Sequence, residues 1–357
     1  MPLLTRMVGV PLLVDIRPGA VDALAPLLAD HRISSGGRVA VAVGPGQGEA
    51  IAQRLAGALP HAQVVHVDGG TLAAGQALAT TLRGDFFDAV VGIGGGRLLD
   101  TVKWSATLTG LPMVAVATNL AHDGIASPVA SLEDEGRKGS YGVQLPVAVV
   151  VDLDYVRQSP ARMRRSGIGD AVSNLSAIAD WELARAKRGE TVDGIAVTLA
   201  RTAALAVLDH PGTIDDDEFL VVLAEALVLS GLAMAVAGTS RPCSGGDHEI
   251  LHAVNHLYPA AGNHGELAGI GALFCTWLRD DSGLAARLSA CLARHGLPRT
   301  PAEVGLTDDE FAAAVSYAPR TRPDRYTVLE HLDLDDAAVR DRVASYVAFC
   351  DVPSRGA

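Results

Sequence analysis

Two hydrophobic patterns follow one another along this chain, and the change between them constrains the fold most strongly. In the first part, short apolar runs alternate with helical segments. The strand-like runs are residues 38–43, 63–67, 89–93, 113–116 and 147–151, and the helical segments between them are 49–58, 72–83 and 97–107. Strands that alternate with helices at these lengths build a parallel sheet covered by helices on both faces.

Beyond residue 154 the periodicity is helical throughout. The predicted helices are residues 170–188, 195–208, 219–237, 249–257, 267–279 and 285–294. A chain of 357 residues is also too long for one comfortable core. We therefore predict an α/β domain over residues 1–154, followed by an all-helical domain over residues 155–357.

The charge and the cysteines narrow the function classes. The net charge is −12, with no basic stripe, which argues against nucleic acid as a partner. The four cysteines show no CxxC spacing, and residues 1–13 are too short and too interrupted by proline for a signal peptide. These features predict free thiols and a cytoplasmic protein.

The apolar stretch 219–237 is long enough to cross a bilayer. It is rich in alanine, follows an acidic run and stands alone in the sequence. A central helix of an all-helical domain explains it better, so we predict no membrane partner.

Three glycines, Gly94, Gly95 and Gly96, lie between the strand 89–93 and the helix 97–107. Bare backbone at a helix N-terminus suits a pyrophosphate, although a tight strand–helix turn would need the same residues. A second glycine loop, 44–46, follows another strand, and parallel strands bring such loops to one edge. That loop carries no acidic side chain, so it allows NADP and leaves NAD open.

Histidines at positions 248, 252 and 256 are four residues apart, so they share one helical face, and His264 follows. Together they favour a metal site over ordinary core or surface histidines. Asp170, at the predicted start of a helix, is the candidate ligand from elsewhere, although an N-cap aspartate is the simpler interpretation.

The segment 248–252 also matches HExxH, the zinc-protease signature. Tyr258 stands where the longer metzincin form needs a histidine, and the nucleotide-like first half would have no role in a protease. A zinc protease is therefore kept only as a remote alternative.

Several motifs resemble a known superfamily. Gly94–Gly96 with Asp100 and Lys103 resembles the GGGxxxDxxK block of dehydroquinate synthase-like proteins, which include iron-dependent alcohol dehydrogenases, glycerol dehydrogenases and sugar-phosphate cyclases. More specific blocks resemble the glycerol-1-phosphate dehydrogenase branch, including its AraM-like bacterial members. These blocks are residues 122–128, 169–174 with 180–181, and 240–245 leading to His248.

The resemblance implies a dehydroquinate synthase-like fold, with an α/β dinucleotide-binding domain over residues 1–154 and an all-helical metal and substrate domain over residues 155–357. It also implies a set of site residues. It implies that Asp170, His248 and His264 hold a divalent metal, with zinc as the first expectation and nickel or iron as alternatives. It places Asp123 and His252 at the substrate, and it implies a homodimer or a larger homo-oligomer. The residues that it assigns to the NAD or NADP cofactor are Gly94, Gly95, Gly96, Arg97, Leu98, Thr118 and Ser127.

The expected reaction is reduction of dihydroxyacetone phosphate by NAD(P)H to sn-glycerol 1-phosphate. The metal would polarise the carbonyl, and His252, or a water that it orients, would deliver the proton. Departures from the family pattern keep a dehydrogenase for another phosphorylated ketone, polyol or sugar phosphate as an alternative. These departures are Ala117, Ala121 and Asp247, where the family usually has proline, serine and glutamate.

Two further alternatives stay open within the same fold. A sugar-phosphate cyclase usually has glutamate where Asp170 stands and uses a lysine-rich substrate site, whereas this chain has only three lysines. A binding protein that has lost catalysis would have no reason to keep the metal and cofactor residues intact.

Overall fold

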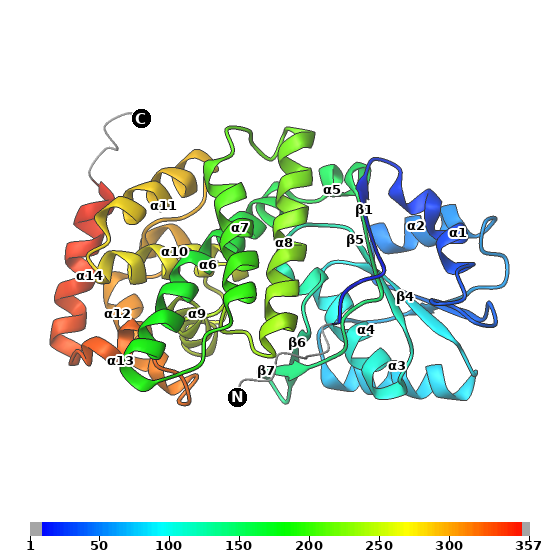
Figure 1. Ribbon diagram of the computed structural model, residues 1–357, viewed down its shortest axis with the longest axis horizontal. Helices are drawn as coiled ribbons and strands as arrows, with labels where there is room; N and C mark the ends of the chain where they lie inside the picture. The colour runs from blue at the N-terminus through cyan, green and yellow to red at the C-terminus, as the bar shows by residue number, and fades with distance from the viewer. Residues whose placement is uncertain (1–8, 352–357) are drawn as a thin grey trace. The chain divides into compact units, whose positions relative to one another are not determined.

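The computed structural model describes residues 9–351 (Figure 1). Backbone contacts divide the chain into two compact units, Met1–Arg164 and Arg165–Ala357. The prediction that residues 1–13 form no signal peptide falls mostly on residues 1–8, which lie outside the described part.

The first unit contains a six-stranded sheet of order β1-β8-β5-β4-β2-β3, in which every neighbouring pair is parallel. The four inner strands are buried at every residue, which explains their continuous apolar runs. The strand bounds are β1 Leu13–Arg17, β2 Val39–Val43, β3 Gln63–His66, β4 Ala89–Gly94, β5 Met113–Ala117 and β8 Ala148–Asp152.

Helices cover both faces of this sheet, as predicted. Residues of α1 and α2 form one hydrophobic core with alternate residues of the inner strands, such as Val41 and Val91. On the other face, Gly92 of β4 approaches Val102 of α4. Figure 1 shows α3 and α4 on one side of the sheet and α1 and α2 on the other. The helix bounds are α1 Leu24–Leu28, α2 Gln47–Leu55, α3 Leu72–Gly84, α4 Gly96–Thr109 and α5 Leu153–Gln158.

The strand order creates a switch point between β2 and β4. From β2 the chain moves outward to β3 and then returns to β4 on the other side of β2. Open α/β sheets bind ligands at such a point, at the carboxyl ends of the strands. The loops 44–46 and 94–96 follow β2 and β4, so the fold brings both glycine loops to this point.

The first unit also contains an antiparallel hairpin that was not predicted from the sequence. Its strands are β6 Val129–Asp134 and β7 Arg137–Gly142. Most residues of β7 are polar or glycine, so it lacks the alternation of a half-buried strand. Glu135 and Gly136 connect the strands with φ values of 48° and 79°, the signs that a type I′ turn requires.

The second unit is all-helical, which confirms the predicted fold class. All six predicted helices occur, and α12 to α14 are additional. The bounds are α6 Ala161–Arg188, α7 Gly194–Asp209, α8 Asp217–Ala237, α9 Gly246–Leu257, α10 His264–Leu278, α11 Ser282–Arg294, α12 Asp308–Tyr317, α13 Val328–Leu332 and α14 Asp336–Asp351.

One prediction about α6 is wrong. The helix begins at Ala161, nine residues before the predicted start, so Asp170 lies inside it rather than at its N-terminus. The interpretation of Asp170 as an N-cap is thereby excluded.

Helix α8 is the apolar stretch that resembles a membrane span. Within residues 9–351 it is the one helix long and apolar enough to cross a bilayer, and 61% of its most apolar window is buried in the protein. Phe219, Leu223 and Leu227 are fully buried, and the helix packs along α7. This burial is what a core helix shows, and a single such helix is weak evidence for a membrane span.

Candidate functional site

Three helices of the second unit bring Asp170, His248 and His264 together. One potential ligand atom from each lies within 4.8 Å of the other two. The Nε2 atoms of His264 and His248 lie 3.0 and 3.7 Å from Oδ1 of Asp170. Asp170 and His248 are buried, whereas 38% of the His264 side chain is exposed. Two imidazoles and one carboxylate form a donor set that suits a divalent ion with open coordination positions.

Backbone contact between α6 and α10 explains why Asp170 and His264 lie so close. Gly169 precedes Asp170 in the sequence, and Gly265 follows His264. The backbone N–H of Gly265 donates a hydrogen bond to Ser166 Oγ at 3.0 Å. A Cβ atom on Gly265 would lie 1.7 Å from the Ser166 carbonyl oxygen, and one on Gly169 would lie 2.1 Å from the Gly265 carbonyl oxygen. Only glycine fits, so the main chain sets the spacing of these two side chains.

A capping box fixes the start of α10. Asn263 accepts a hydrogen bond from Glu266 N, and the Glu266 carboxylate accepts one from Asn263 N. His264 is the first residue of the helix. Its backbone is therefore held on both sides, by the cap and by the glycine contact.

Asp247 supports His248 from behind. It is fully buried, and its Oδ1 accepts the backbone N–H groups of Gly245 and His248 at 2.8 and 2.6 Å. The same oxygen lies 3.0 Å from His248 Nδ1. This contact assigns the ring proton to Nδ1 and leaves Nε2 to act as a ligand. From the sequence, Asp247 was only a departure from the family pattern, and this supporting role was not predicted.

The electrostatics of the cluster favour a cation. Burial alone would raise the pKa of Asp170, but the charges and hydrogen bonds of His264 and His248 lower it well below its usual range. Burial alone would lower the pKa of His248, but Asp170 and Asp247 raise it to about 10. Two buried carboxylates thus create a negative potential where the imidazole nitrogens converge.

The histidine stripe on α9 divides into three different environments. His252 is half-buried, and its Nε2 lies 3.1 Å from Nη2 of Arg322. Burial, and then the charge of Arg322, lowers the pKa of His252 well below its usual range. A guanidinium can only donate, so Nε2 accepts and the ring proton lies on Nδ1. His256 is exposed and stacks on Tyr317, with 5.3 Å between the ring centroids.

The HExxH pattern does not form a protease-like site. The cluster consists of Asp170, His248 and His264 and does not include His252. Glu249, which a protease would use as general base, is fully buried, and its Oε2 accepts a hydrogen bond from Thr327 at 3.1 Å.

The glycine loop lies where α4 begins. This helix has no side-chain hydrogen bond at its N-cap, Gly95, so its first N–H groups are not capped from within. A Cβ atom on Gly94, Gly95 or Gly96 would lie 2.1–2.5 Å from side-chain atoms of Leu98, Asn119 and His122, respectively. An uncapped helix end beside bare backbone fits a dinucleotide pyrophosphate.

The other predicted cofactor residues surround this loop. Thr118 is buried, and its N–H donates to the Gly94 carbonyl at 3.1 Å. Leu98 is buried, while Arg97 donates to the Gly69 carbonyl at 3.2 Å. The structure brings these residues together, and their contacts with a cofactor stay predictions.

A buried ion pair holds the segment that contains Ser127. Lys103 Nζ lies 2.9 Å from Asp100 Oδ1, and it donates to the Ser127 and Val129 carbonyls at 3.3 and 2.5 Å. Ser127 is buried, with its Oγ 3.4 Å from the same Nζ. Asp123 begins a short 3-10 turn, Asp123–Ile125, and is half-buried. The GGGxxxDxxK pattern therefore also has a structural function, since it positions the loop 122–128.

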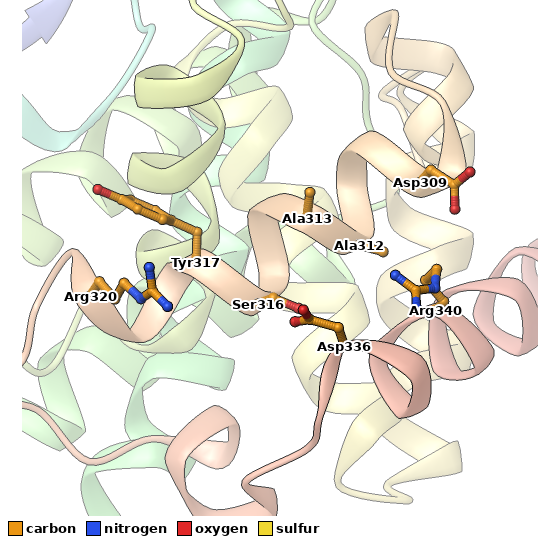
Figure 2. Close-up of a pocket in the computed structure, with 8 residues that line it drawn as sticks. All are labelled: Asp309, Ala312, Ala313, Ser316, Tyr317, Arg320, Asp336 and Arg340. Atoms are coloured by element: carbon orange, nitrogen blue, oxygen red, sulfur yellow. The ribbon is translucent and has the colours of Figure 1, made fainter.

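A surface groove in the second unit contains none of the predicted site residues. Figure 2 shows its lining from α12, the following turn and the start of α14. The Arg320 guanidinium lies 5.7 Å from the Tyr317 ring centroid at this groove.

Comparison with known proteins gives related sequences and a shared fold. The family model described as iron-containing alcohol dehydrogenase matches residues 15–160. The glycerol-1-phosphate dehydrogenase [NAD(P)+] of Cenarchaeum symbiosum (strain A) is 40% identical over 254 residues, which is 70% of each chain. The enzyme of the same name from Archaeoglobus fulgidus is 37% identical over 262 residues, covering 71% of this chain and 75% of that one.

Solved structures show the same architecture. A probable glycerol dehydrogenase from Sinorhizobium meliloti 1021 superposes with a TM-score of 0.78 at 24% identity, over 97% of this chain and 99% of that one. Glycerol dehydrogenase from Schizosaccharomyces pombe gives a TM-score of 0.78 at 20% identity, over 97% and 91% of the two chains. These structures confirm the predicted fold, and the sequence relatives confirm the predicted branch. The chain belongs to the glycerol-1-phosphate dehydrogenase family, a branch of the iron-containing alcohol dehydrogenases.

Proposed function

We propose that this protein is a metal-dependent NAD(P)H oxidoreductase that reduces dihydroxyacetone phosphate to sn-glycerol 1-phosphate. The observation that carries the proposal is the convergence of Asp170, His248 and His264 within 4.8 Å. It occurs in a chain that is 40% identical to a glycerol-1-phosphate dehydrogenase [NAD(P)+].

In this proposal Asp170, His248 and His264 hold the metal, with zinc as the proposed ion and nickel or iron as alternatives. Bound there, the divalent ion supplies Lewis-acid polarisation of the substrate carbonyl. Asp247 keeps the His248 Nε2 lone pair directed at the site. The glycine contact between α6 and α10 holds the Asp170 and His264 backbones in place.

For the cofactor, we propose that the N-terminus of α4 binds the pyrophosphate through Gly94, Gly95, Gly96, Arg97 and Leu98, with Thr118 and Ser127 at the nicotinamide half. The N–H groups of the uncapped helix and its dipole provide the attraction. The loop 44–46 at the same sheet edge has no carboxylate to repel a 2′-phosphate. Both NADH and NADPH are therefore proposed as donors.

The reduction adds a hydride to the carbonyl carbon and a proton to its oxygen. Neutral His252 presents Nδ1–H, because Nε2 accepts from Arg322. We propose that this group orients the water that protonates the new alcohol oxygen, and that Asp123 contacts the substrate.

Further proposals concern the cellular setting. The net charge of −12 and four buried free cysteines support a cytoplasmic enzyme that binds neither nucleic acid nor membrane. A homodimer or larger homo-oligomer, and functional domains over residues 1–154 and 155–357, stay proposals from the family resemblance and the sequence pattern.

The test is metal analysis combined with turnover assays. Purified protein is assayed with dihydroxyacetone phosphate and a panel of phosphorylated ketones, using NADH and NADPH in turn. Turnover of dihydroxyacetone phosphate with bound divalent metal is expected. Turnover of another ketone alone would favour the related polyol or sugar-phosphate dehydrogenase. Absence of any NAD(P)H oxidation would overturn the proposal and leave the cyclase or the binding protein.

A further inference from the structure

We infer that Arg322, backed by Arg325, binds the phosphate group of the substrate and thereby makes the enzyme select phosphorylated ketones. The inference rests on the proposed function, since it assigns the part of that substrate which does not react.

The position of Arg322 supports this role. Arg322 follows the turn Ala318–Arg320 and precedes α13, and its Nη2 lies 3.1 Å from Nε2 of His252. His252 lies one helical turn after His248, on the same face of α9. Arg322 and His252 are both half-buried, so a ligand can reach them. The guanidinium therefore lies against the face of α9 that also carries the metal ligand His248.

The uncompensated charge of Arg325 also supports this role. Arg325 Nη1 donates to the Ser244 carbonyl and, at 3.1 Å, to its Oγ, and Nη2 donates to Ser240 Oγ at 2.6 Å. All of these acceptors are neutral. The charge of Arg241, in contrast, is neutralised by Glu190. Nε and Nη2 of Arg241 donate to the two carboxylate oxygens of Glu190 at 2.8 and 2.6 Å.

The arginines also act on one another. Burial, and then the charges of Arg322 and Arg241, lowers the pKa of Arg325 to about 10, while Glu249 and Asp324 raise it. Arg325 therefore stays charged at neutral pH, in a partly buried setting where cations repel each other. A dianionic group bound at Arg322 would offset this repulsion.

The chemistry of guanidinium and phosphate groups supports the same role. A guanidinium binds phosphate oxygens through parallel N–H donors, and it carries several donors, so bonds to His252 and to a phosphate are compatible. In a phosphorylated hydroxyketone only a methylene carbon and an ester oxygen separate the carbonyl from the phosphorus. The chain has three lysines, Lys103, Lys138 and Lys187, and none belongs to α9 or to the segment 318–332. In this part of the second unit an arginine must supply the charge.

The competing explanation is that Arg322 only orients His252. The two roles differ in their effect on substrate choice. Loss of an orienting residue would slow the reduction of every ketone by a similar factor. Loss of a residue that also binds phosphate would add a further loss on phosphorylated ketones, which their unphosphorylated analogues would not show.

The experiment compares R322A, R322K and a matched control, R320A. Arg320 lies two residues away in the sequence, at the groove of Figure 2, where its guanidinium lies over the Tyr317 ring. For each zinc-loaded protein, kcat/KM is measured with dihydroxyacetone phosphate and with dihydroxyacetone, and inorganic phosphate is titrated by calorimetry.

For R322A we expect kcat/KM on dihydroxyacetone phosphate to fall roughly a hundredfold more than kcat/KM on dihydroxyacetone, because only the phosphorylated ketone loses a charge-assisted contact. A smaller loss that is common to both ketones reflects the bond from Arg322 to His252. R322K keeps a positive charge but loses the parallel N–H donors of the guanidinium. Its kcat/KM on dihydroxyacetone phosphate should therefore lie between those of wild type and R322A, and R320A should match wild type. Phosphate binding should weaken at least about tenfold in R322A. An equal loss on both ketones, or no loss on either, would overturn the inference.

Failure of the proposed function is distinguishable from failure of this inference. If wild type reduces neither ketone, the proposed function fails, and the phosphate titration alone decides the role of Arg322. Weaker phosphate binding in R322A would then support the anion site, and equal binding would exclude it. If circular dichroism shows that R322A is misfolded, R322K and R322Q carry the same comparison.

Discussion

Oδ1 of Asp247 lies 3.0 Å from Nδ1 of His248, on the opposite side of the ring from Asp170. The carboxylate fixes the plane of the ring and holds the proton on Nδ1, so that Nε2 faces Asp170. A partner of this kind stabilises a metal ligand without touching the metal.

The first prediction concerns this pair. D247A should weaken metal affinity by about 10- to 100-fold, and D247N, which keeps an acceptor but loses the charge, should weaken it less. Chelator competition on the purified proteins measures the change, with D308N on the surface of α12 as the control. Equal metal affinity in all four proteins would show that Asp247 does not support the site.

The second prediction uses the three histidines of α9 as an internal comparison. H248A should lose its bound metal and its activity together. H252A should keep its metal and lose most of its activity, because His252 orients the proton donor rather than binding the ion. H256A should keep both, because His256 is exposed and stacks on Tyr317.

Metal content by elemental analysis and turnover with dihydroxyacetone phosphate separate these cases. Loss of metal in H252A would show that His248 and His252 bind the metal together, as in an HExxH protease. It would contradict the assignment of His252 to the substrate.

The third prediction concerns the contact between α6 and α10. In G265A the added methyl group would lie 1.7 Å from the Ser166 carbonyl oxygen, so the two helices must move apart. We expect a loss of roughly 2–4 kcal/mol in the free energy of unfolding, together with weaker metal binding. G194A is the matched control, because a methyl group there meets no atom within 4 Å. Urea unfolding with and without metal tests this, and wild-type behaviour of G265A would contradict the predicted contact.

The fourth prediction is a pH dependence of stability that comes from His295. Burial, and then the charges of Arg294, Arg165 and His210, lowers the pKa of this residue from 6.5 to about 4. Its ring stacks on Phe219, with 4.9 Å between the centroids. Between these two pH values the unfolded chain binds a proton that the folded chain does not. The contribution of His295 is therefore complete above pH 6.5 and falls as the pH drops toward 4.

H295F keeps the stack and removes the titration, so the decline of its urea midpoint between pH 7 and pH 4.5 should be shallower than in wild type. H61Q, at an exposed histidine, should leave the decline unchanged. Parallel curves for wild type and H295F would show that another group controls the acid response.

The two halves of the chain differ in how far their sequences predict the structure. The α/β half was predictable because strands buried on both faces read as continuous apolar runs, as in β2 and β4. The start of α6 was not, because Gly167 and Gly169 are poor helix formers. There the packing around the metal-ligand cluster overrides local propensity.

The candidate site divides in the same way. The ligand set came from motif resemblance, whereas the spacing that joins Asp170 to His264 depends on a crossing of helices that no local pattern records. Arg322 lies in a segment without periodicity, seventy positions from His252, so only the fold reveals their contact.

The close backbone contact between α6 and α10 has a consequence for the binding and release of the metal ion. Flexible chelators must be ordered when a cation enters, and the entropy of that ordering weakens binding. Here the ordering occurs during folding, since two glycine backbones determine where the carboxylate and the imidazole stand. The emptied protein should behave as a rigid receptor that can be stripped and reloaded, or loaded with a different divalent ion, without refolding.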